Sequence, residues 1–296
     1  MVSRSYRVLA VVSIILLVSM ILYVLSTVQS ELSIYNTGGN GASLFYEKLE
    51  PRLLLDIEGL EKLSNNTAVI TPLLKKPSDR DYTAMLKYVY RGGLLIVLDE
   101  EGYSNRLFSI LGLNIRVMNT TVLDEIMKNK TRYYPLALLA KPVNSIDHVL
   151  LYKPVYIYIR PIGKRVEVVA ETSPYSYADM DGNEYYSFGE PMKSFVVCIR
   201  VGYGAGSIIL ISDKDFISNN VVESSSNIEF IEYMIGNRTP YYCILYTNPT
   251  LIDIIRYYLY SSSQESVSGT LYTVVVIVVG VLFSLVYNYV VKKHSL

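Results

Sequence analysis

The chain has 296 residues, of which 51% are hydrophobic and 18% charged, and its mean hydropathy of +0.27 is higher than expected for an ordinary soluble enzyme. Its 27 basic and 27 acidic side chains balance, and no cluster of bases points to a nucleic-acid partner. Two cysteines without a CxxC motif argue against a disulfide framework or a structural zinc site, and His148 is the single histidine outside the C-terminal tail, which argues against Ser-His-Asp catalysis.

Residues 8–25 form an apolar run that Ser13 and Ser19 interrupt. As a helix this run would reach about 27 Å, enough to cross a thin hydrocarbon core. A cleaved signal peptide is the alternative, but its apolar region would be shorter, and no A-x-A-like site follows the run. The sequence therefore predicts a first transmembrane helix at 8–25.

A second apolar run without charges covers 271–291. Basic residues flank both runs on the terminal side, so the positive-inside rule predicts a two-pass protein in a lipid bilayer, with both termini cytoplasmic and residues 31–260 outside. Four N-x-S/T sequons agree with an exterior, glycosylated segment: Asn65, Asn119, Asn129 and Asn237. In that compartment Cys198 and Cys243 would either pair or remain buried thiols.

The segment 31–260 begins with alternating strand and helix signals. Apolar strands are expected at 67–71 and 94–98, with an amphipathic helix at 78–91 between them. This βαβ pattern predicts a parallel sheet covered by helices on both faces. Further helices are expected at 42–49, 105–111 and 228–235.

The second half of the segment is richer in strands, which are expected at 155–159, 166–170, 195–201 and 207–211. Gly202, Gly204 and Gly206 precede the last of these strands, so they predict a hairpin turn and not a dinucleotide-binding loop. A serine-rich stretch predicts a flexible tether at 261–270.

Two groups of polar residues are placed where ligands bind in α/β proteins. The loop Asn36–Gly41 precedes a helix, whose first N–H groups could hold an anion, although a turn plus N-cap is the favoured explanation of the loop. Asp213, Asp215 and Asn219 follow the strand at 207–211, and ligands bind at the carboxyl ends of such strands; capping of the next turn is the alternative. Asn36, Gly41, Asp213, Asp215 and Asn219 form the predicted ligand site.

The segment Asp179–Glu190 (DMDGNEYYSFGE) places Asp179, Asp181, Asn183 and Glu190 at the spacing of oxygen ligands in an EF-hand loop. Ca²⁺ is therefore the candidate metal, and no other cofactor is expected. Glu184 stands where the sharp turn of such a loop requires glycine, and prolines flank the segment in place of two helices. A polar hairpin tip is the alternative explanation.

Several motifs resemble a prokaryotic family of membrane-anchored proteins that is described as a domain of unknown function. They are Tyr35–Thr37 with Gly41, Arg91–Gly93 before LLIVL, Thr172–Gly182 (TSPYSYADMDG) and Gly204–Asn219 (GAGSIILISDKDFISN). The resemblance implies a gene neighbourhood with MoxR-type AAA ATPases. It also implies an α/β fold, a flavodoxin-like (class I glutamine-amidotransferase-like) three-layer sandwich with a strand-rich second half, flanked by two transmembrane helices. The catalytic Cys and His of amidotransferases have no counterpart here, so the resemblance points away from hydrolysis.

Together these features predict a membrane-anchored, extracytoplasmic, non-catalytic scaffold or ligand-binding subunit. Its expected partner is another protein in an ABC-type or AAA ATPase-linked membrane assembly. The alternative is a hydrolase that acts on envelope carbohydrate or peptide through a metal ion or a carboxylate pair, for which the candidate acids are Asp179, Asp181, Asp213 and Asp215.

Overall fold

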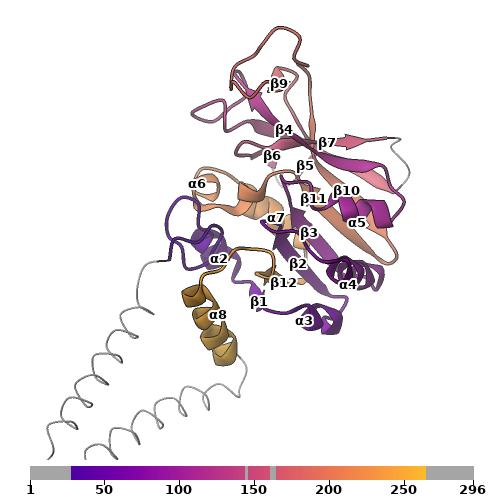
Figure 1. Cartoon of the computed structure of the whole chain (residues 1–296), viewed down its shortest axis with the longest axis vertical. Coiled ribbons are helices and arrows are strands. Elements are labelled where there is room, and N and C mark those ends of the chain that lie inside the picture. Colours follow the sequence, from indigo (N-terminus) through magenta and orange to yellow (C-terminus); the bar gives the residue numbers. More distant parts are fainter. Residues whose placement is uncertain (1–27, 144–145, 161–164, 265–296) are drawn as a thin grey trace, which may run out of the picture. The chain divides into compact units, whose positions relative to one another are not determined.

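The computed structural model describes residues 28–143, 146–160 and 165–264 (Figure 1). Residues 29–249 form one compact unit, whereas Val28 and Thr250–Gln264 belong to a second unit. The second unit contributes helix α8 (Leu251–Gln264) to the description. At the start of α8 the Asp253 carboxylate accepts a hydrogen bond of 2.8 Å from the Thr250 backbone N–H, which is a typical N-cap arrangement.

The first unit is built on a nine-stranded mixed sheet in the order β1-β12-β2-β3-β11-β10-β8-β5-β6. Its first five strands run parallel: β1 (Arg52–Leu54), β12 (Thr239–Cys243), β2 (Thr67–Pro72), β3 (Leu94–Leu98) and β11 (Gly206–Ile211). The other four are antiparallel: β10 (Val196–Tyr203), β8 (Val166–Thr172), β5 (Leu136–Val143) and β6 (Ile146–Leu150).

The central strands are buried because their sequences are continuously apolar. Every residue of β2 and β3 is buried, and so are the last four residues of β11. A strand with no polar side chain along it can be stable where both faces of the sheet are covered. These three strands therefore lie in the middle of the unit and fix where their carboxyl ends meet.

Helices cover the two faces of the parallel strands (Figure 1). Helix α4 (Asp79–Tyr90) packs on β3 and β11, and α3 (Ile57–Lys62) and α5 (Asn105–Ile110) contact α4. The predicted helix at 78–91 is confirmed, with Ser78 and Asp81 forming a capping box. On the other side lie α2 (Ser43–Leu49), α6 (Asn219–Val222) and α7 (Asn227–Ile235), which contact one another.

A second, three-stranded antiparallel sheet has the order β7-β4-β9. It consists of β7 (Val155–Ile159), β4 (Ile115–Asp124) and β9 (Ser176–Ala178). Apolar residues of β4 and β7 join the core beneath α4 and α5, together with residues of β8 and β10. This sheet therefore covers part of the same face of the large sheet as α4.

The expected flavodoxin-like, amidotransferase-like three-layer sandwich is wrong. The strand-rich second half does not continue a parallel, doubly wound sheet; instead β10, β8, β5 and β6 extend it in antiparallel fashion. The reversal occurs at the β10–β11 hairpin, where Tyr203 pairs with Gly206. The hairpin predicted from the three glycines is thus confirmed, and it is the reason why the sheet changes direction.

The expectation of a two-pass membrane protein with residues 31–260 outside is also corrected. No helix among the described residues is long and apolar enough to cross a membrane. The two stretches on which the expectation depended, 8–25 and 271–291, lie outside the described residues. Of the stretch expected to be a tether, residues 261–264 belong to α8, and 265–270 are likewise outside.

The two cysteines are free thiols. Cys198 lies on β10 and Cys243 on β12, and both are buried. Three strands (β11, β3 and β2) separate β10 from β12 in the sheet, and neighbouring strands are about 4.8 Å apart. This spacing exceeds the reach of a disulfide, so the alternative of two buried thiols is the correct one.

Candidate functional site

The candidate site lies where the parallel strands β3 and β11 end side by side. The Asp99 N–H donates to the Ile211 carbonyl over 3.0 Å, so the two chains stay paired beyond the last strand residues. After β3 the chain continues toward α5, whereas after β11 it continues toward α6 and α7 on the other side of the sheet (Figure 1). The carboxyl ends of strands at such a divergence are the usual ligand position in open α/β sheets.

Three carboxylates converge at these strand ends. Glu100 follows β3, and Asp213 and Asp215 follow β11; one carboxylate oxygen of each lies within 4.8 Å of those of the other two. Asp213 is fully buried, and its Oδ2 accepts from the Tyr152 N–H and its Oδ1 from the Asp215 N–H, both over 2.8 Å. The predicted strand-end position of Asp213 and Asp215 is therefore where the structure gathers acidic groups.

Asp215 differs from its neighbours in that its carboxylate makes no direct hydrogen bond or ion pair with the described residues. Its residue exposure is 8%, and within the described residues its carboxylate accepts no hydrogen bond and forms no ion pair. A buried ionised group without compensation is costly. A positively charged group bound to the Asp215 carboxylate would offset this cost.

Lys214 supplies a single positive charge at the edge of the carboxylates. Its Nζ lies 2.8 Å from Glu100 Oε1 and 3.1 Å from Glu31 Oε1. Two of the acidic side chains at the site, Glu100 and Glu31, therefore pair directly with the one ammonium group. Lys214 also attracts Asp215, but burial and repulsion from Glu100 outweigh this attraction.

The pKa values of the site reflect this imbalance. Burial, followed by repulsion from Asp215, raises the pKa of Asp213 well above its usual value. Burial, followed by repulsion from Glu100, raises the pKa of Asp215 to about 7. Burial also raises the pKa of Glu100, against the pull of Lys214. For Lys214, burial opposes the charged form, but its ion pairs outweigh burial and raise its pKa.

The other predicted ligand residues connect the loop before α2 with the segment after β11 through hydrogen bonds within the protein. Asn219 is 5% exposed; its Oδ1 accepts from the Leu44 N–H over 2.9 Å, and its Nδ2 donates to the carbonyls of Asn36 and Gly38. Asn219 thereby caps the first turn of α2, for which the neighbouring Ala42 offers no side-chain cap.

The loop before α2 is closed on itself. The Asn36 Oδ1 accepts from the Gly38 N–H, and a Cβ added to Gly41 would lie 1.8 Å from the Asn36 carbonyl oxygen. Asn36, Gly41 and Asn219 therefore lie together, as predicted, but their polar groups bind one another. The turn-plus-cap explanation of this loop is the one that the structure supports.

The predicted calcium loop brings three of its four ligands together. Asp179, Asp181 and Glu190 lie within 4.8 Å of one another through their carboxylate oxygens. The Asn183 side chain does not join them as an oxygen ligand: its Oδ1 accepts from the Tyr185 N–H and its Nδ2 donates to Asp181.

Hydrogen bonds within the same loop occupy its carboxylates. Asp179 accepts from the N–H groups of Gly182, Asn183 and Glu184, and Glu190 accepts from those of Met180 and Ser187. Glu184, at the position that requires glycine in an EF-hand, adopts a left-handed φ of 66°. The polar tip is thus held without an ion, and calcium binding here stays a prediction.

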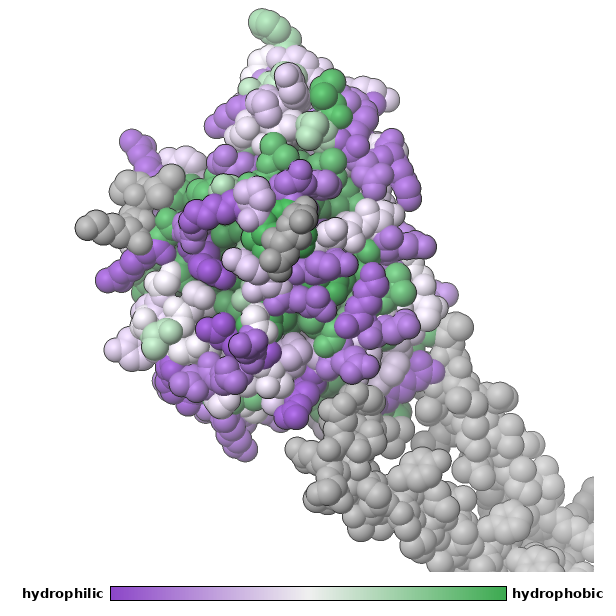
Figure 2. Space-filling model, turned by 180° about the vertical axis from the view of Figure 1, so that it is seen from behind, coloured by the Kyte–Doolittle hydropathy of each residue, from purple (hydrophilic) through white to green (hydrophobic). Residues whose placement is uncertain are grey.

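The loop also carries exposed apolar side chains, including a fully exposed Phe188, together with Met180 and Tyr185. Figure 1 places it at the top of the view, beyond β9. Figure 2, seen from behind, shows hydrophilic residues spread over the rest of this face with smaller hydrophobic areas between them.

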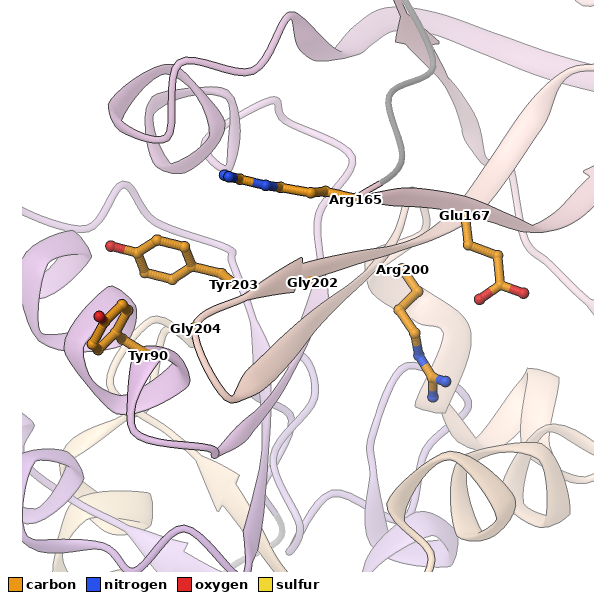
Figure 3. Close-up of a pocket in the computed structure, with 7 residues that line it drawn as sticks. All are labelled: Tyr90, Arg165, Glu167, Arg200, Gly202, Tyr203 and Gly204. Atoms are coloured by element: carbon orange, nitrogen blue, oxygen red, sulfur yellow. The ribbon is translucent and has the colours of Figure 1, made fainter.

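A surface hollow of about 700 Å³ lies at the opposite end of β11 from the carboxylates. Its lining residues are Tyr90, Arg165, Glu167, Arg200, Gly202, Tyr203 and Gly204 (Figure 3). Figure 3 shows the Arg165 and Arg200 side chains pointing in different directions, and Glu167 is bound to Lys141 over 2.9 Å. Its charged groups do not converge, so the strand-end site is the better candidate.

The residues predicted from the sequence did not include Glu100, Lys214 and Glu31. Glu100 has a sequence signal, because Asp99 and Glu100 follow the strand at 94–98 just as Asp213 and Asp215 follow the strand at 207–211, and ligands bind at the carboxyl ends of such strands. Asp99 itself is structural, because its carboxylate accepts from the N–H groups of Glu101, Tyr103 and Ser104. No sequence signal placed Glu31 near the site.

The family model for the domain of unknown function DUF4350 matches residues 34–235. The chain therefore belongs to the DUF4350 family, which is the kind of family that the sequence motifs indicated. No curated protein matches the chain.

Solved structures give distant similarities. The mmIFT52 N-terminal domain is 13% identical, with a TM-score of 0.43, and the match covers 60% of this chain and 78% of that domain. Cytoplasmic protein STM1381 from Salmonella typhimurium LT2 is 10% identical, with a TM-score of 0.39 and coverage of 67% and 80%. The β-galactosidase from Bacillus circulans sp. alkalophilus is 15% identical, with a TM-score of 0.34, and the match covers 56% of this chain and 23% of that enzyme. These similarities are too low to transfer a function.

Proposed function

We propose that this member of the DUF4350 family is a non-catalytic binding subunit, and that the carboxylate cluster at the carboxyl ends of β3 and β11 binds a positively charged group. The observation that supports the proposal is Asp215, a buried carboxylate without a partner beside Glu100 and Asp213. Such a group lowers its free energy when a cationic group enters, because the cation replaces lost hydration.

The reactive side chains of the described residues support a binding role over catalysis. Burial raises the pKa of both Cys198 and Cys243, which disfavours the nucleophilic thiolate. His148 is exposed, and its Nδ1 is engaged with the Asp147 carboxylate. Neither cysteine forms, with this histidine, the nucleophile–base pair that covalent hydrolysis requires.

We expect the positively charged group to belong to a complex of this chain with other proteins. We expect a partner protein of the kind that the family resemblance implies, an ABC-type or MoxR-type AAA ATPase system. The site's acidic character favours a cationic group, and it disfavours nucleic acid, whose phosphates the carboxylates would repel.

Affinity purification of the tagged full-length chain from its native cells tests this proposal. The paired change Asp213→Asn with Asp215→Asn removes two charges and keeps the shape of both side chains. We expect stoichiometric partners of the native chain to be lost from this variant. Asp79→Asn with Asp147→Asn, at two exposed carboxylates, is the matched control and should retain them. Retention of every partner by the folded Asp213/Asp215 variant would contradict the proposal.

A further inference from the structure

We propose that Glu100, Asp213 and Asp215 together bind one divalent metal ion at the carboxyl ends of β3 and β11. This inference rests on the proposed function, because it names the positively charged group that the same carboxylate cluster binds. The metal ion would be bound by side chains of this chain, and its binding does not depend on which partner protein the chain has.

The spacing of the oxygen atoms fits a shared ion. Two oxygens bound to one Mg²⁺ at about 2.1 Å are at most about 4.2 Å apart, and two bound to one Ca²⁺ at about 2.4 Å at most about 4.8 Å. One carboxylate oxygen from each of Glu100, Asp213 and Asp215 lies within 4.8 Å of the other two. The three ligands are therefore already gathered to about the span of one coordination sphere.

Asp215 is the ligand that most clearly lacks a partner. The residue is 8% exposed, yet its carboxylate accepts no hydrogen bond from the residues that the structure describes. Buried polar groups in folded proteins nearly always have a partner, so a carboxylate that lacks one and lies beside two others favours a cation as the shared partner. A metal ion would satisfy all three groups at once.

The surroundings provide the support that metal ligands usually have. The Tyr152 and Asp215 N–H groups each donate to Asp213 over 2.8 Å and fix its orientation. Lys214 Nζ holds Glu100 Oε1 at 2.8 Å. Hydrogen bonds of this kind orient ligands and tune affinity.

The donor set selects a class of ion. All three donors are carboxylate oxygens, and neither a histidine nor a cysteine belongs to this cluster. Hard cations, namely Mg²⁺, Mn²⁺ and Ca²⁺, prefer such ligands, whereas Zn²⁺ and copper favour nitrogen and sulfur. With Lys214 and Glu31 also present, a divalent charge would leave the site close to neutral.

Isothermal titration of the full-length chain, first freed of metal with EDTA, tests the inference with Mn²⁺, Mg²⁺ and Ca²⁺ as probes. We expect one high-affinity ion per chain and a loss of affinity of roughly tenfold or more for Asp215→Asn, since even second-shell changes cost that much. Asp181→Asn, in the acidic loop after β9, should bind like the native chain.

No binding by the native chain at millimolar ion would overturn the inference, as would binding that Asp181→Asn abolishes and Asp215→Asn retains. Circular dichroism of each variant verifies folding. Partner purification separates this inference from the proposed function: a chain that binds its partner through Asp213 and Asp215 but takes no metal contradicts the metal site alone. A chain that binds the metal but loses no partner in the Asp213/Asp215 variant contradicts the proposed function alone.

Discussion

Asp215 is the residue whose surroundings differ most from those of an ordinary surface carboxylate. In the folded chain its pKa is about 7, whereas in the unfolded chain it titrates near the usual value of about 3.9. Between these two pH values the folded state holds a proton that the unfolded state releases. Stability from this group is therefore present at low pH and is lost as the pH rises toward 7.

Asp215→Asn should accordingly stabilise the metal-free protein at pH 8. Because one pKa unit is equivalent to about 1.4 kcal/mol, we expect a gain of at least about 1 kcal/mol, which should nearly vanish at pH 4. Asp213, Glu100, Glu31, Lys214 and Tyr134 face the group, and the loss of repulsion from Asp215 lowers the pKa of Asp213 in the variant, which adds to the gain at pH 8. Urea unfolding at the two pH values, with EDTA present, measures the difference. Equal stabilities at pH 8 would show that Asp215 is not an uncompensated charge.

Asn219 has a different role, because it ties the loop before α2 to the segment after β11. Asn219→Ala removes hydrogen bonds to the Leu44 N–H and to the carbonyls of Asn36 and Gly38. We expect a loss of about 2–3 kcal/mol, since it leaves buried backbone groups unpaired. Asn220→Ala, at the exposed neighbouring position, is the control and should cost little. Similar urea midpoints for the two variants would contradict the stabilising role of the Asn219 hydrogen bonds.

At the scale of elements, the β10–β11 hairpin sets the direction of half the sheet and depends on close packing against α4. A Cβ at Gly206 would lie 2.3 Å from the carbonyl oxygens of Gly93 and Val89, whereas one at Gly202 would be 4.0 Å from its nearest neighbour. The turn has therefore little room for a side chain at one glycine and enough at the other.

Gly206→Ala should destabilise the protein by about 1–3 kcal/mol through overpacking, and Gly202→Ala should be nearly neutral. Thermal unfolding monitored by circular dichroism compares the two. An equal melting temperature for both variants would contradict the close approach of the hairpin to the end of α4.

The elements that the sequence predicted well are those whose own residues determine them. The apolar runs of β2, β3 and β11 and the capped, amphipathic α4 are confirmed. Strands β5 and β6 were missed, because exposed and buried residues mix in both and β5 contains Pro142. Short β1 and β9 carry too few residues for a pattern, and their pairing depends on distant partners.

The candidate site shows the same division. Asp213 and Asp215 were predictable because they follow a buried strand directly. Glu100 lies beside them because β3 and β11 pair in parallel. The two strands are more than a hundred residues apart in sequence, so this pairing could not be predicted from either strand by itself. The Asn36 loop was placed correctly but assigned a ligand role, since a polar group bound within the protein and one bound to a ligand look alike in sequence.

At the scale of the whole molecule, a bound ion should couple the site to the stability of the entire unit. The ion binds the folded chain alone, so at a hundred times its dissociation constant it should stabilise the fold by about 2.7 kcal/mol. Differential scanning calorimetry at pH 8, with and without Mn²⁺, should show a higher melting temperature with the ion. EDTA should reverse the increase. Asp215→Asn should show little response, and a full response in that variant would place the ion elsewhere.

The most direct test of the account is an anomalous difference map from crystals of the full-length protein grown with Mn²⁺. We expect one strong peak per chain, about 2.0–2.6 Å from carboxylate oxygens of Glu100, Asp213 and Asp215. A peak that lies instead between Asp179, Asp181 and Glu190, or no peak at the ends of β3 and β11, would contradict the central claim that these strand ends bind a cation.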